Sequence, residues 1–289
     1  MNYRHHFHAG NFADVFKHVL LLRLIAAMQR KEKGFLHLDT HAGRGGYDLS
    51  MPATLPEGRV REPEFPQGIG RLWEQAGLPA PLADYVALVR RFNERQGVPA
   101  RELKYYPGSP WLAKYVLRPQ DRLALCELHP DDVEALEFEL GREPRVSVQA
   151  ADGYKALKGA LPPPEKRALV LVDPPFESQG EFAAILGGID AALRRLPAAV
   201  LAVWYPITER AGSEAFLREV AARPTPALAA EMTIAGPQAA MRMKGCGLLV
   251  LNPPWRIESE IQEILPELVQ RLGTGADAAS RCTWVVADH

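Results

Sequence analysis

The sequence predicts an α/β fold with a doubly wound, mostly parallel sheet. Three observations predict it: short apolar runs alternate with helical segments, a Gly-rich turn follows the first run, and polar residues stand where successive runs end. A chain of 289 residues can bury one full core. We therefore expect one large domain that carries an insertion.

The elements can be assigned in chain order. Asn11 can cap a helix that runs from about Phe12 to Arg30, because its apolar positions recur at helical spacing. The stretch from Phe35 to Thr40 predicts a buried strand, which ends in a Gly-rich turn over residues 42–46. Later strands are expected at Arg122–Leu128, Val146–Ala150, Ala168–Val172, Ala199–Trp204, Leu228–Ile234, Gly247–Leu251 and Thr283–Val286. Helices are expected at Pro130–Leu140, Gly153–Gly159 and Glu181–Arg195.

One segment interrupts this alternation of strands and helices. Residues 49–104 begin with a Pro-rich stretch and continue with two helical patterns, Ile69–Ala76 and Pro81–Gln96, and no strand is evident among them. We interpret the segment as a small helical insertion after the first strand. The main domain is then expected to comprise residues 1–48 and 105–289.

The composition excludes several classes of protein. Three cysteines are too few and too scattered for a disulfide framework or a zinc site. The most apolar run, Val19–Met28, is short and contains Arg23, so it cannot span a bilayer, and the first residues lack the apolar core of a signal peptide. We therefore expect a cytoplasmic protein. Nothing in the sequence requires a partner chain, so we expect a monomer.

The charge distribution allows two interpretations of the first segment. The net charge of −1 gives no overall basic footprint for nucleic acid, yet residues 1–33 hold six basic residues and two acidic ones. A local basic surface of this kind can contact phosphates while the whole chain stays neutral. A solvated helix face is the simpler interpretation of the same residues.

Polar residues follow four successive strands, at the edge where open α/β sheets bind ligands. Gly43 follows the first strand and lets the backbone approach a ligand closely. Glu127 follows the second strand and can accept hydrogen bonds from ribose hydroxyls, and Asp152-Gly153 follows the third, where the carboxylate can accept from an adenine amino group. Asp173 opens the turn after the fourth strand. Any one of these residues could be an ordinary surface residue, but their order predicts a site for a nucleoside cofactor.

The turn Asp173-Pro174-Pro175-Phe176 predicts methyl transfer to an exocyclic amino group. Two prolines remove both backbone donors, so the turn offers only hydrogen-bond acceptors. An adenine amino group can donate one hydrogen to the Asp173 carboxylate and the other to the Pro174 carbonyl, which turns its lone pair towards a sulfonium methyl group. Phe176 can stack on the base. Catalysis then consists mainly of positioning for in-line transfer and of stabilising the charge that develops on nitrogen.

A second copy of the pattern competes with the first. Asn252-Pro253-Pro254-Trp255 also follows an apolar strand. We favour the Asp173 copy because it closes the fourth strand, beside the candidate cofactor residues. The Asn252 copy comes far later, and we expect it towards the other edge of the sheet, where a Pro-Pro turn can simply start a helix.

The sequence resembles the bacterial 23S ribosomal RNA adenine-N6 methyltransferase J family from its first residues to its last strand. The matching motifs are Tyr3-Arg4-His5, Phe7-His8-Ala9-Gly10-Asn11, Ala13-Asp14-Val15, Lys17-His18, Leu38-Asp39-Thr40-His41-Ala42-Gly43, Tyr105-Tyr106-Pro107-Gly108-Ser109-Pro110, Glu127-Leu128-His129-Pro130, Ala151-Asp152-Gly153, Asp173-Pro174-Pro175, Trp204-Tyr205-Pro206 and Asn252-Pro253-Pro254-Trp255. His-Ala-Gly-Asn and Asp-Thr-His-Ala-Gly are far more specific than a generic Gly-rich turn.

The resemblance implies a Rossmann-like class I methyltransferase fold with a small helical insertion. It implies S-adenosyl-L-methionine as methyl donor, S-adenosyl-L-homocysteine as product and one adenine of 23S rRNA as target. The residues implied to bind the donor are His18, His41, Ser109, Glu127, Asp152, Gly153 and Asp173. The residues implied to bind the substrate are Tyr3, Lys17 and Phe176, with the N-terminal segment as a lid over donor and base. The family usually has Tyr where this chain has Phe176, a change that keeps the stacking face and removes the hydroxyl.

Three other functions use related features. The histidines near the N-terminus stand without a carboxylate or Cys at ligand spacing, so we expect no metal site. DNA adenine and protein glutamine methyltransferases use a similar turn, although Asn at its first position is typical of the glutamine enzymes. A catalytically silent RNA-binding module is the alternative outside enzymes, since a fold alone does not establish activity.

Overall fold

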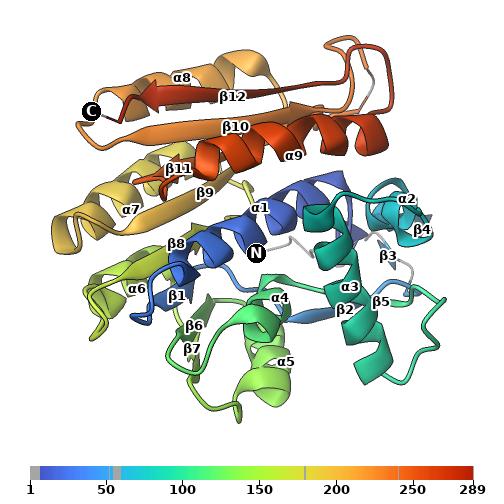
Figure 1. Cartoon of the computed structure of the whole chain (residues 1–289), viewed down its shortest axis with the longest axis horizontal. Coiled ribbons are helices and arrows are strands. Elements are labelled where there is room, and N and C mark those ends of the chain that lie inside the picture. Colours follow the sequence, from blue (N-terminus) through green and yellow to red (C-terminus); the bar gives the residue numbers. More distant parts are fainter. Residues whose placement is uncertain (1–6, 52, 55–59, 179, 240, 289) are drawn as a thin grey trace.

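The computed structural model describes residues 7–51, 53–54, 60–178, 180–239 and 241–288, and these build an eight-stranded mixed sheet. The strands lie in the order β12-β10-β11-β9-β8-β1-β6-β7 (Figure 1). Their bounds are β1 Leu36–Asp39, β6 Arg122–Glu127, β7 Val146–Ala150, β8 Ala168–Val172, β9 Val200–Ile207, β10 Ala227–Thr233, β11 Gly245–Leu251 and β12 Ala279–Val286.

The sheet has a parallel part and an antiparallel part. Strands β9, β8, β1, β6 and β7 are parallel to one another, so their carboxyl ends meet at one edge. Strand β11 runs antiparallel to both β9 and β10, and β12 runs antiparallel to β10. The prediction of an α/β fold with a doubly wound, mostly parallel sheet is therefore confirmed.

Helices cover both faces of the sheet. Their bounds are α1 Phe12–Gln29, α4 Ser109–Val116, α5 Pro130–Leu140, α6 Gly153–Ala160, α7 Glu181–Arg195, α8 Arg210–Ala221 and α9 Ile257–Leu272. Apolar residues of α1, α4, α5 and α9 share one core, and those of α6, α7 and α8 share the other. Strand β8 alternates between them, since Leu169 and Leu171 enter the first core and Val170 the second. Burial on both faces explains why this strand is a continuous apolar run.

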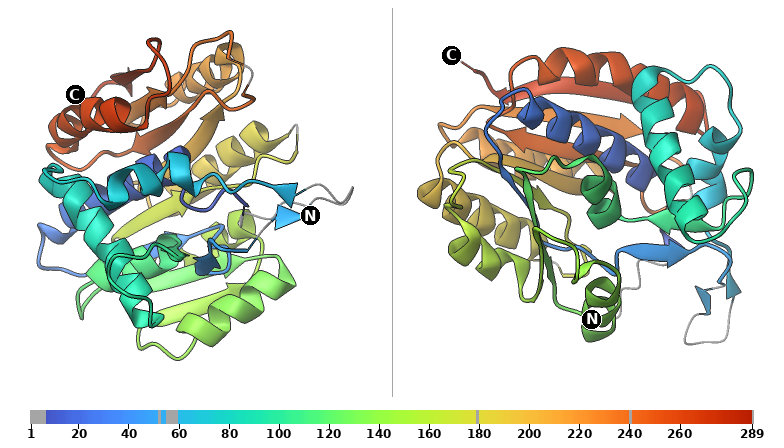
Figure 2. Two further views of the ribbon diagram at one scale, coloured as in Figure 1. Left: turned by 90° about the vertical axis from the view of Figure 1, so that its right-hand side faces the viewer. Right: turned by 60° about the horizontal axis from the view of Figure 1, so that its bottom comes forward.

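Helix α1 is nearly enclosed by the rest of the molecule. Fourteen of its 18 residues are buried, and it packs between α9 on one side and α3 and α4 on the other (Figures 1 and 2). The Asn11 side chain accepts hydrogen bonds from the Ala13 and Asp14 amides, both at 3.0 Å, and so caps its first turn. Polar groups on this helix, including Lys17, therefore need partners inside the protein.

A basic surface over residues 1–33, one of the two interpretations of the charge pattern, is smaller than the composition suggests. Lys17 is buried and closed to a phosphate group, whereas Arg23 and the exposed Arg30 both pair with the Glu260 carboxylate. Lys31 and Lys33 are exposed. Arg4 lies outside the described residues.

The segment 49–104 is mainly helical, as predicted, but it also contains strands. It holds α2 Ile69–Trp73, α3 Ala80–Arg95, the 3-10 turn η2 Phe65–Gln67, and the two-residue strands β3 Ala53–Thr54 and β4 Val60–Arg61, which pair with each other. The prediction that this segment has no strand is therefore wrong, because a two-residue pairing is too short to leave an alternating pattern. Strands β2 Gly46–Asp48 and β5 Tyr105–Pro107 pair where the segment leaves and rejoins the main chain.

A buried carboxylate joins the antiparallel strands. Glu231 of β10 is 1% exposed and accepts hydrogen bonds from Tyr205 of β9 at 2.8 Å and from Arg210 of α8 at 2.7 Å. Arg281 of β12 also donates to it. Because a buried charge is costly without partners, these three donors tie β12 to the rest of the sheet. No helix of the described residues is long and apolar enough to cross a membrane.

Candidate active site

A large cavity opens at the carboxyl edge of the parallel strands. Its volume is about 1520 Å³, and residues that follow β1, β6, β7, β8 and β9 line it together with the first turns of α1. The volume exceeds what one drug-sized ligand needs, so a nucleoside cofactor and a second base fit together. His18, His41, Ser109, Glu127, Asp152, Gly153 and the Asp173 turn all line this cavity, as does Lys17. Tyr3 and the first six residues of the N-terminal segment, which was expected to form a lid, lie outside the described residues.

Glu127 stands at the end of β6 with most of its hydrogen-bonding capacity already used. One carboxylate oxygen accepts from the backbone amides of Leu128 and His129, at 2.7 and 2.8 Å, and the other accepts from the Gly43 amide at 2.8 Å. A carboxylate offers about four acceptor positions. The remaining position leaves room for one strong hydrogen bond to a ribose diol rather than for two.

Asp152 caps the first turn of α6. Its Oδ1 accepts from the Tyr154 and Lys155 amides at 3.0 and 3.2 Å, which is the ordinary structural role of an N-cap. Its Oδ2 makes only a 3.6 Å contact with the Lys155 ammonium group, and that oxygen is the one that an adenine amino group can reach.

Two glycines keep the floor of the cavity bare. Gly43 has φ +61°, and a Cβ there would lie 2.4 Å from the Tyr47 hydroxyl. A Cβ on Gly153 would lie 2.0 Å from the Thr40 carbonyl oxygen. Both positions therefore exclude a side chain. The bare backbone and the nearby carboxylates form a cradle that fits an adenosine moiety.

Asp39 is a site residue that the strand-end comparison overlooked. It is fully buried at the end of β1 and accepts hydrogen bonds from the Ser109 hydroxyl at 2.6 Å and the His41 amide at 3.2 Å. Burial, with a smaller contribution from the Asp173 carboxylate, raises the pKa of Asp39 to about 7, although the bond from Ser109 opposes the shift. Asp39 therefore fixes two of the predicted donor-binding residues. The sequence feature that could have identified Asp39 is its position as a carboxylate at the end of an apolar strand.

The two histidines expected to bind the donor are held by neighbouring hydroxyl groups. The Nδ1 atom of His18 lies 2.7 Å from the Tyr106 hydroxyl, and that of His41 lies 2.8 Å from the Thr40 hydroxyl. Burial lowers the pKa of His41 despite the attraction of nearby carboxylates. His41 is therefore neutral at pH 7. A neutral ring can approach a sulfonium cation without repulsion.

The Asp173 carboxylate meets a buried lysine. Lys17 Nζ lies 2.5 Å from Asp173 Oδ2 and 2.9 Å from Asp14 Oδ1. Burial acts to lower the pKa of Lys17, but Asp14 and Asp173 together raise it well above its usual value, so the ammonium group stays charged. Asp14 lies three residues before Lys17 on α1, and this helical spacing is the sequence feature from which their contact could have been predicted. The contact with Lys17 fixes the orientation of the Asp173 carboxylate.

Phe176 and Trp204 form an aromatic wall beside this carboxylate. Their ring centroids lie 5.8 Å apart in an edge-on arrangement, and Phe182 packs edge-on against Phe176 at 5.2 Å. Phe176 has φ +50°, an unusual conformation for a bulky side chain, and it lines the cavity. Such a wall can hold the flat face of a base.

The second Pro-Pro turn lies at the opposite edge of the sheet. Strand β11 runs antiparallel to β9, so its last residue, Leu251, pairs with Leu201 near the start of β9. Asn252 donates to the carbonyl oxygens of Pro197 and Ala199, both at 2.8 Å, and the turn leads into α9. We expected this turn near the last strand at the side of the sheet, but β11 is an inner strand. The turn is remote from the cavity because β11 runs antiparallel to β9, so that it ends where the parallel strands begin.

The charges around the cavity are mainly negative. The described lining residues include nine carboxylates, against Lys17 and Arg242 as the only lysine or arginine among them. This favours a cationic ligand such as a sulfonium compound and disfavours the phosphates of a nucleic acid. Among the described residues, no three His, Cys, Asp or Glu side chains are placed to hold a metal ion.

Comparisons with known proteins agree with this geometry. A sequence model of the family described as Ribosomal RNA large subunit methyltransferase D, RlmJ, matches residues 32–286. A protein of Escherichia coli named Ribosomal RNA large subunit methyltransferase J is 38% identical over 289 residues, which is 100% of both chains. Its namesake from Haemophilus influenzae is 38% identical over 280 residues, or 96% of each chain.

A solved structure shares the fold as well as the sequence. The crystal structure of a Legionella pneumophila protein is 36% identical, with a TM-score of 0.86, and the match covers 96% of this chain and 98% of that one. The sequence match and this structural match both extend over nearly the whole chain. The protein therefore belongs to the RlmJ family of ribosomal RNA large subunit methyltransferases.

Proposed function

We propose that this protein methylates the N6 atom of an adenine in 23S rRNA, with S-adenosyl-L-methionine as the donor. The observation that carries the proposal is the position of the Asp173-Pro174-Pro175-Phe176 turn, which lines the same cavity as Glu127 and Asp152. The names of the related proteins support rRNA as the substrate.

The donor would lie along the ends of β1, β6 and β7. Glu127 would accept from the ribose, Asp152 from the adenine amino group, and His18, His41 and Ser109 would surround the methionine end. When bound, S-adenosyl-L-methionine supplies an electrophilic methyl group. The neutral His41 ring and the surrounding carboxylates favour its positive charge over the neutral product.

The target amino group would lie between the Asp173 side chain and the Pro174 carbonyl. Lys17 holds the Asp173 carboxylate in position to accept a hydrogen from N6 and to stabilise the positive charge that grows there. Pro174 and Pro175 offer no competing donor. Phe176 and Trp204 would hold the base edge and face, and this fixes the angle at which nitrogen meets the donor.

A transfer assay with three substrates tests the proposal. The protein is incubated with radiolabelled S-adenosyl-L-methionine and, separately, deproteinised 23S rRNA, duplex DNA and a protein extract. We expect label in rRNA, recovered as N6-methyladenine after digestion. Label in DNA or in protein alone would replace the rRNA proposal by one of the related methyltransferase activities.

Donor binding tests the catalytically silent alternative. Calorimetry with S-adenosyl-L-methionine and S-adenosyl-L-homocysteine should show one site per chain. Absence of binding by a folded protein would favour an RNA-binding module.

As part of the same proposal, the protein acts as a monomer in the bacterial cytoplasm, and residues 49–104 form an insertion subdomain.

A further inference from the structure

We infer that the edge of the sheet opposite the cavity is a second contact surface for the rRNA backbone. The inference rests on the proposed function. The surface, called here the distal basic surface, comprises Lys31, Lys33, Arg118, Arg145, Lys166 and Arg167. Its residues precede β1, β6, β7 and β8, whereas the cavity lies where these strands end.

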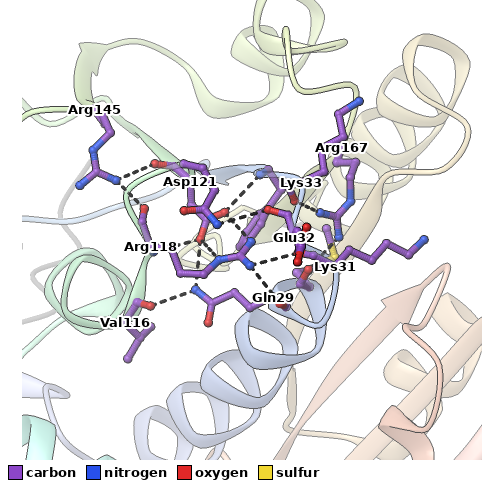
Figure 3. Close-up of polar contacts among 12 residues, drawn as sticks. Gln29, Lys31, Glu32, Lys33, Val116, Arg118, Asp121, Arg145 and Arg167 are labelled. Carbon is purple, nitrogen blue, oxygen red and sulfur yellow. Dashed lines mark hydrogen bonds and ion pairs between the residues drawn. The ribbon is translucent and has the colours of Figure 1, made fainter.

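The arginines of this surface are held in place by carbonyl oxygens. Arg118 donates to the carbonyls of Gln29 and Lys31, both at 3.0 Å, and Arg145 donates to that of Asp121 at 3.1 Å (Figure 3). Arg167 donates to the Met28 carbonyl at 2.7 Å. Carbonyl oxygens satisfy donors without cancelling charge. Within the described part of the chain, Arg118 is the one of these three arginines that also pairs with a carboxylate, that of Asp121, so the positive charge of the surface persists.

The lysines of the surface extend into solvent. Lys31, Lys33 and Lys166 are exposed, and no hydrogen bond or ion pair of their side chains occurs among the described residues. Figure 3 shows the Lys31 ammonium group pointing away from the bonded network. Burial lowers the pKa of Arg167, and the neighbouring Arg118 charge adds to this shift. A polyanion would relieve this crowding of like charges.

The charges of the molecule are segregated between its two edges. Residues 30–33, 118–122, 142–145 and 165–167 contain nine basic and four acidic residues, although the whole chain has 34 and 35. The described cavity lining has the opposite sign, with nine carboxylates and two basic residues. This described lining disfavours phosphates, so a basic surface elsewhere would help to hold a long RNA.

An exposed tryptophan adjoins the distal basic surface and gives it a stacking platform. Trp255 is 72% exposed, and the Arg256 guanidinium lies over its ring at 4.2 Å. Arg30, the residue before Lys31, donates to the Trp255 carbonyl, so the second Pro-Pro turn is fastened beside the lysines. Basic groups interspersed with an exposed aromatic ring are typical of surfaces that bind unpaired nucleotides. This accounts for the motif that the cavity leaves unused.

A purely structural role explains only part of the surface. Arg118, Arg145 and Arg167 fasten loops, and that function would suffice for them. It does not explain three exposed lysines and an exposed Trp-Arg pair at the same edge. An RNA that reaches both edges must pass a strand of five residues, about 17 Å at 3.3 Å per residue, and the loops at its two ends. At roughly 3.4 Å per nucleotide the strand alone corresponds to about five nucleotides, so an RNA with no more than about five nucleotides on either side of the target adenine does not extend past the loops to this surface.

The experiment compares two double charge reversals. Lys31→Glu/Lys33→Glu alters the distal basic surface, and Arg101→Glu/Arg218→Glu makes the same change of net charge at two exposed residues elsewhere. Both variants should unfold at the temperature of the unaltered protein. We expect the first variant alone to bind a 23S rRNA transcript roughly tenfold or more weakly at 0.15 M salt, with a salt-dependence slope reduced by about 1.5 to 2.

The kinetics should distinguish docking from catalysis. For 23S rRNA, the first variant should raise KM and leave kcat unchanged, because only ground-state binding is lost. On an RNA of about ten nucleotides around the methylated adenine, it should match the unaltered protein. Trp255→Ala should weaken transcript binding about fivefold or more, and Trp255→Phe should restore it.

Equal transcript affinity and salt slope for the two double variants would overturn the inference, as would an equal loss on the short RNA. Failure of the proposed function looks different, since the unaltered protein would then not methylate rRNA at all. Transcript binding tests the distal basic surface in that case too, because it requires no turnover.

Discussion

At the scale of single residues, the pairing of Asp173 with Lys17 determines what the amino-group site can do. The lysine lies 2.5 Å from Asp173 and is also held by Asp14 at 2.9 Å. Removal of Asp173 therefore leaves Lys17 with a charged partner. The buried lysine keeps its charge, and the fold should tolerate the change.

Asp173→Ala should lower kcat by about a hundredfold or more, since it removes an acceptor that stabilises developing positive charge. The affinity for S-adenosyl-L-homocysteine should change by no more than about threefold. Single-turnover assays and calorimetry measure the two quantities. If Asp173→Ala keeps full activity, the turn does not hold the amino group.

The matched control is Asn252→Ala in the second turn. It removes two hydrogen bonds to the Pro197 and Ala199 carbonyls and so should cost about 1 to 3 kcal/mol of stability. It should leave kcat unchanged. Inactivation by Asn252→Ala, together with tolerance of Asp173→Ala, would show that the chemistry takes place at the second turn and not at the Asp173 turn.

Asp39→Asn should stabilise the protein more at pH 8 than at pH 5. Burial raises the pKa of Asp39 to about 7, so the folded state holds this proton more tightly than the unfolded state. The unaltered protein therefore loses stability as the pH rises from about 4 to 7 and loses no more above that. Asn cannot ionise and keeps an acceptor for Ser109.

Urea unfolding of both proteins at several pH values measures this effect. The difference in unfolding free energy should grow by a few kcal/mol from pH 5 to pH 8. A difference independent of pH would mean that Asp39 is not the titrating group.

At the scale of elements, the junction of α6 with β1 shapes the floor of the cavity. Gly153→Ala would place a Cβ 2.0 Å from the Thr40 carbonyl oxygen and force the start of α6 away from β1. We expect at least a tenfold loss of affinity for S-adenosyl-L-homocysteine and a lower melting temperature. Calorimetry and thermal unfolding test this.

The same helix supplies the control. A Cβ on Gly159 would meet no described atom within 4 Å apart from those of its chain neighbours and of its own helix backbone. Gly159→Ala should therefore keep donor affinity and add about 0.5 to 1 kcal/mol of stability, because Ala is the better helix residue. Equal effects of the two substitutions would show that close packing at Gly153 is unimportant.

Elements with one dominant pattern could be predicted from the sequence. The capped α1 and the apolar β8 lie where their periodicity placed them. A helix start at the second Pro-Pro turn was considered, but no bounds were predicted for α9, whose pattern Pro266 interrupts; helix α4, whose second residue is Pro110, was not predicted. In both, tertiary packing outweighs the local signal.

At the scale of the whole molecule, donor binding should be visible as stability. S-adenosyl-L-homocysteine at about 100 times its Kd should add about 2.7 kcal/mol to the unfolding free energy. Thermal unfolding should therefore shift upward by several degrees. Glu127→Gln should shrink this shift, and an undiminished shift would remove Glu127 from the donor site.

The position of the site was predictable, but its internal bonding was not. Strand order alone placed Glu127, Asp152 and Asp173 at one edge. The contact between Lys17 and Asp173 joins residues 156 apart, and the reversal of β11 that removes Asn252 from the cavity is a property of the complete sheet. Neither leaves a local trace in the sequence.

The Glu231 cluster constrains the order in which parts of this protein can fold during its synthesis. Fifty residues separate Glu231 from Arg281, and a ribosome needs roughly 3 to 10 s to add them. During that interval a nascent chain that closes its sheet early must bury Glu231 without Arg281. The parallel strands can assemble during synthesis, but the antiparallel end is complete only when β12 emerges.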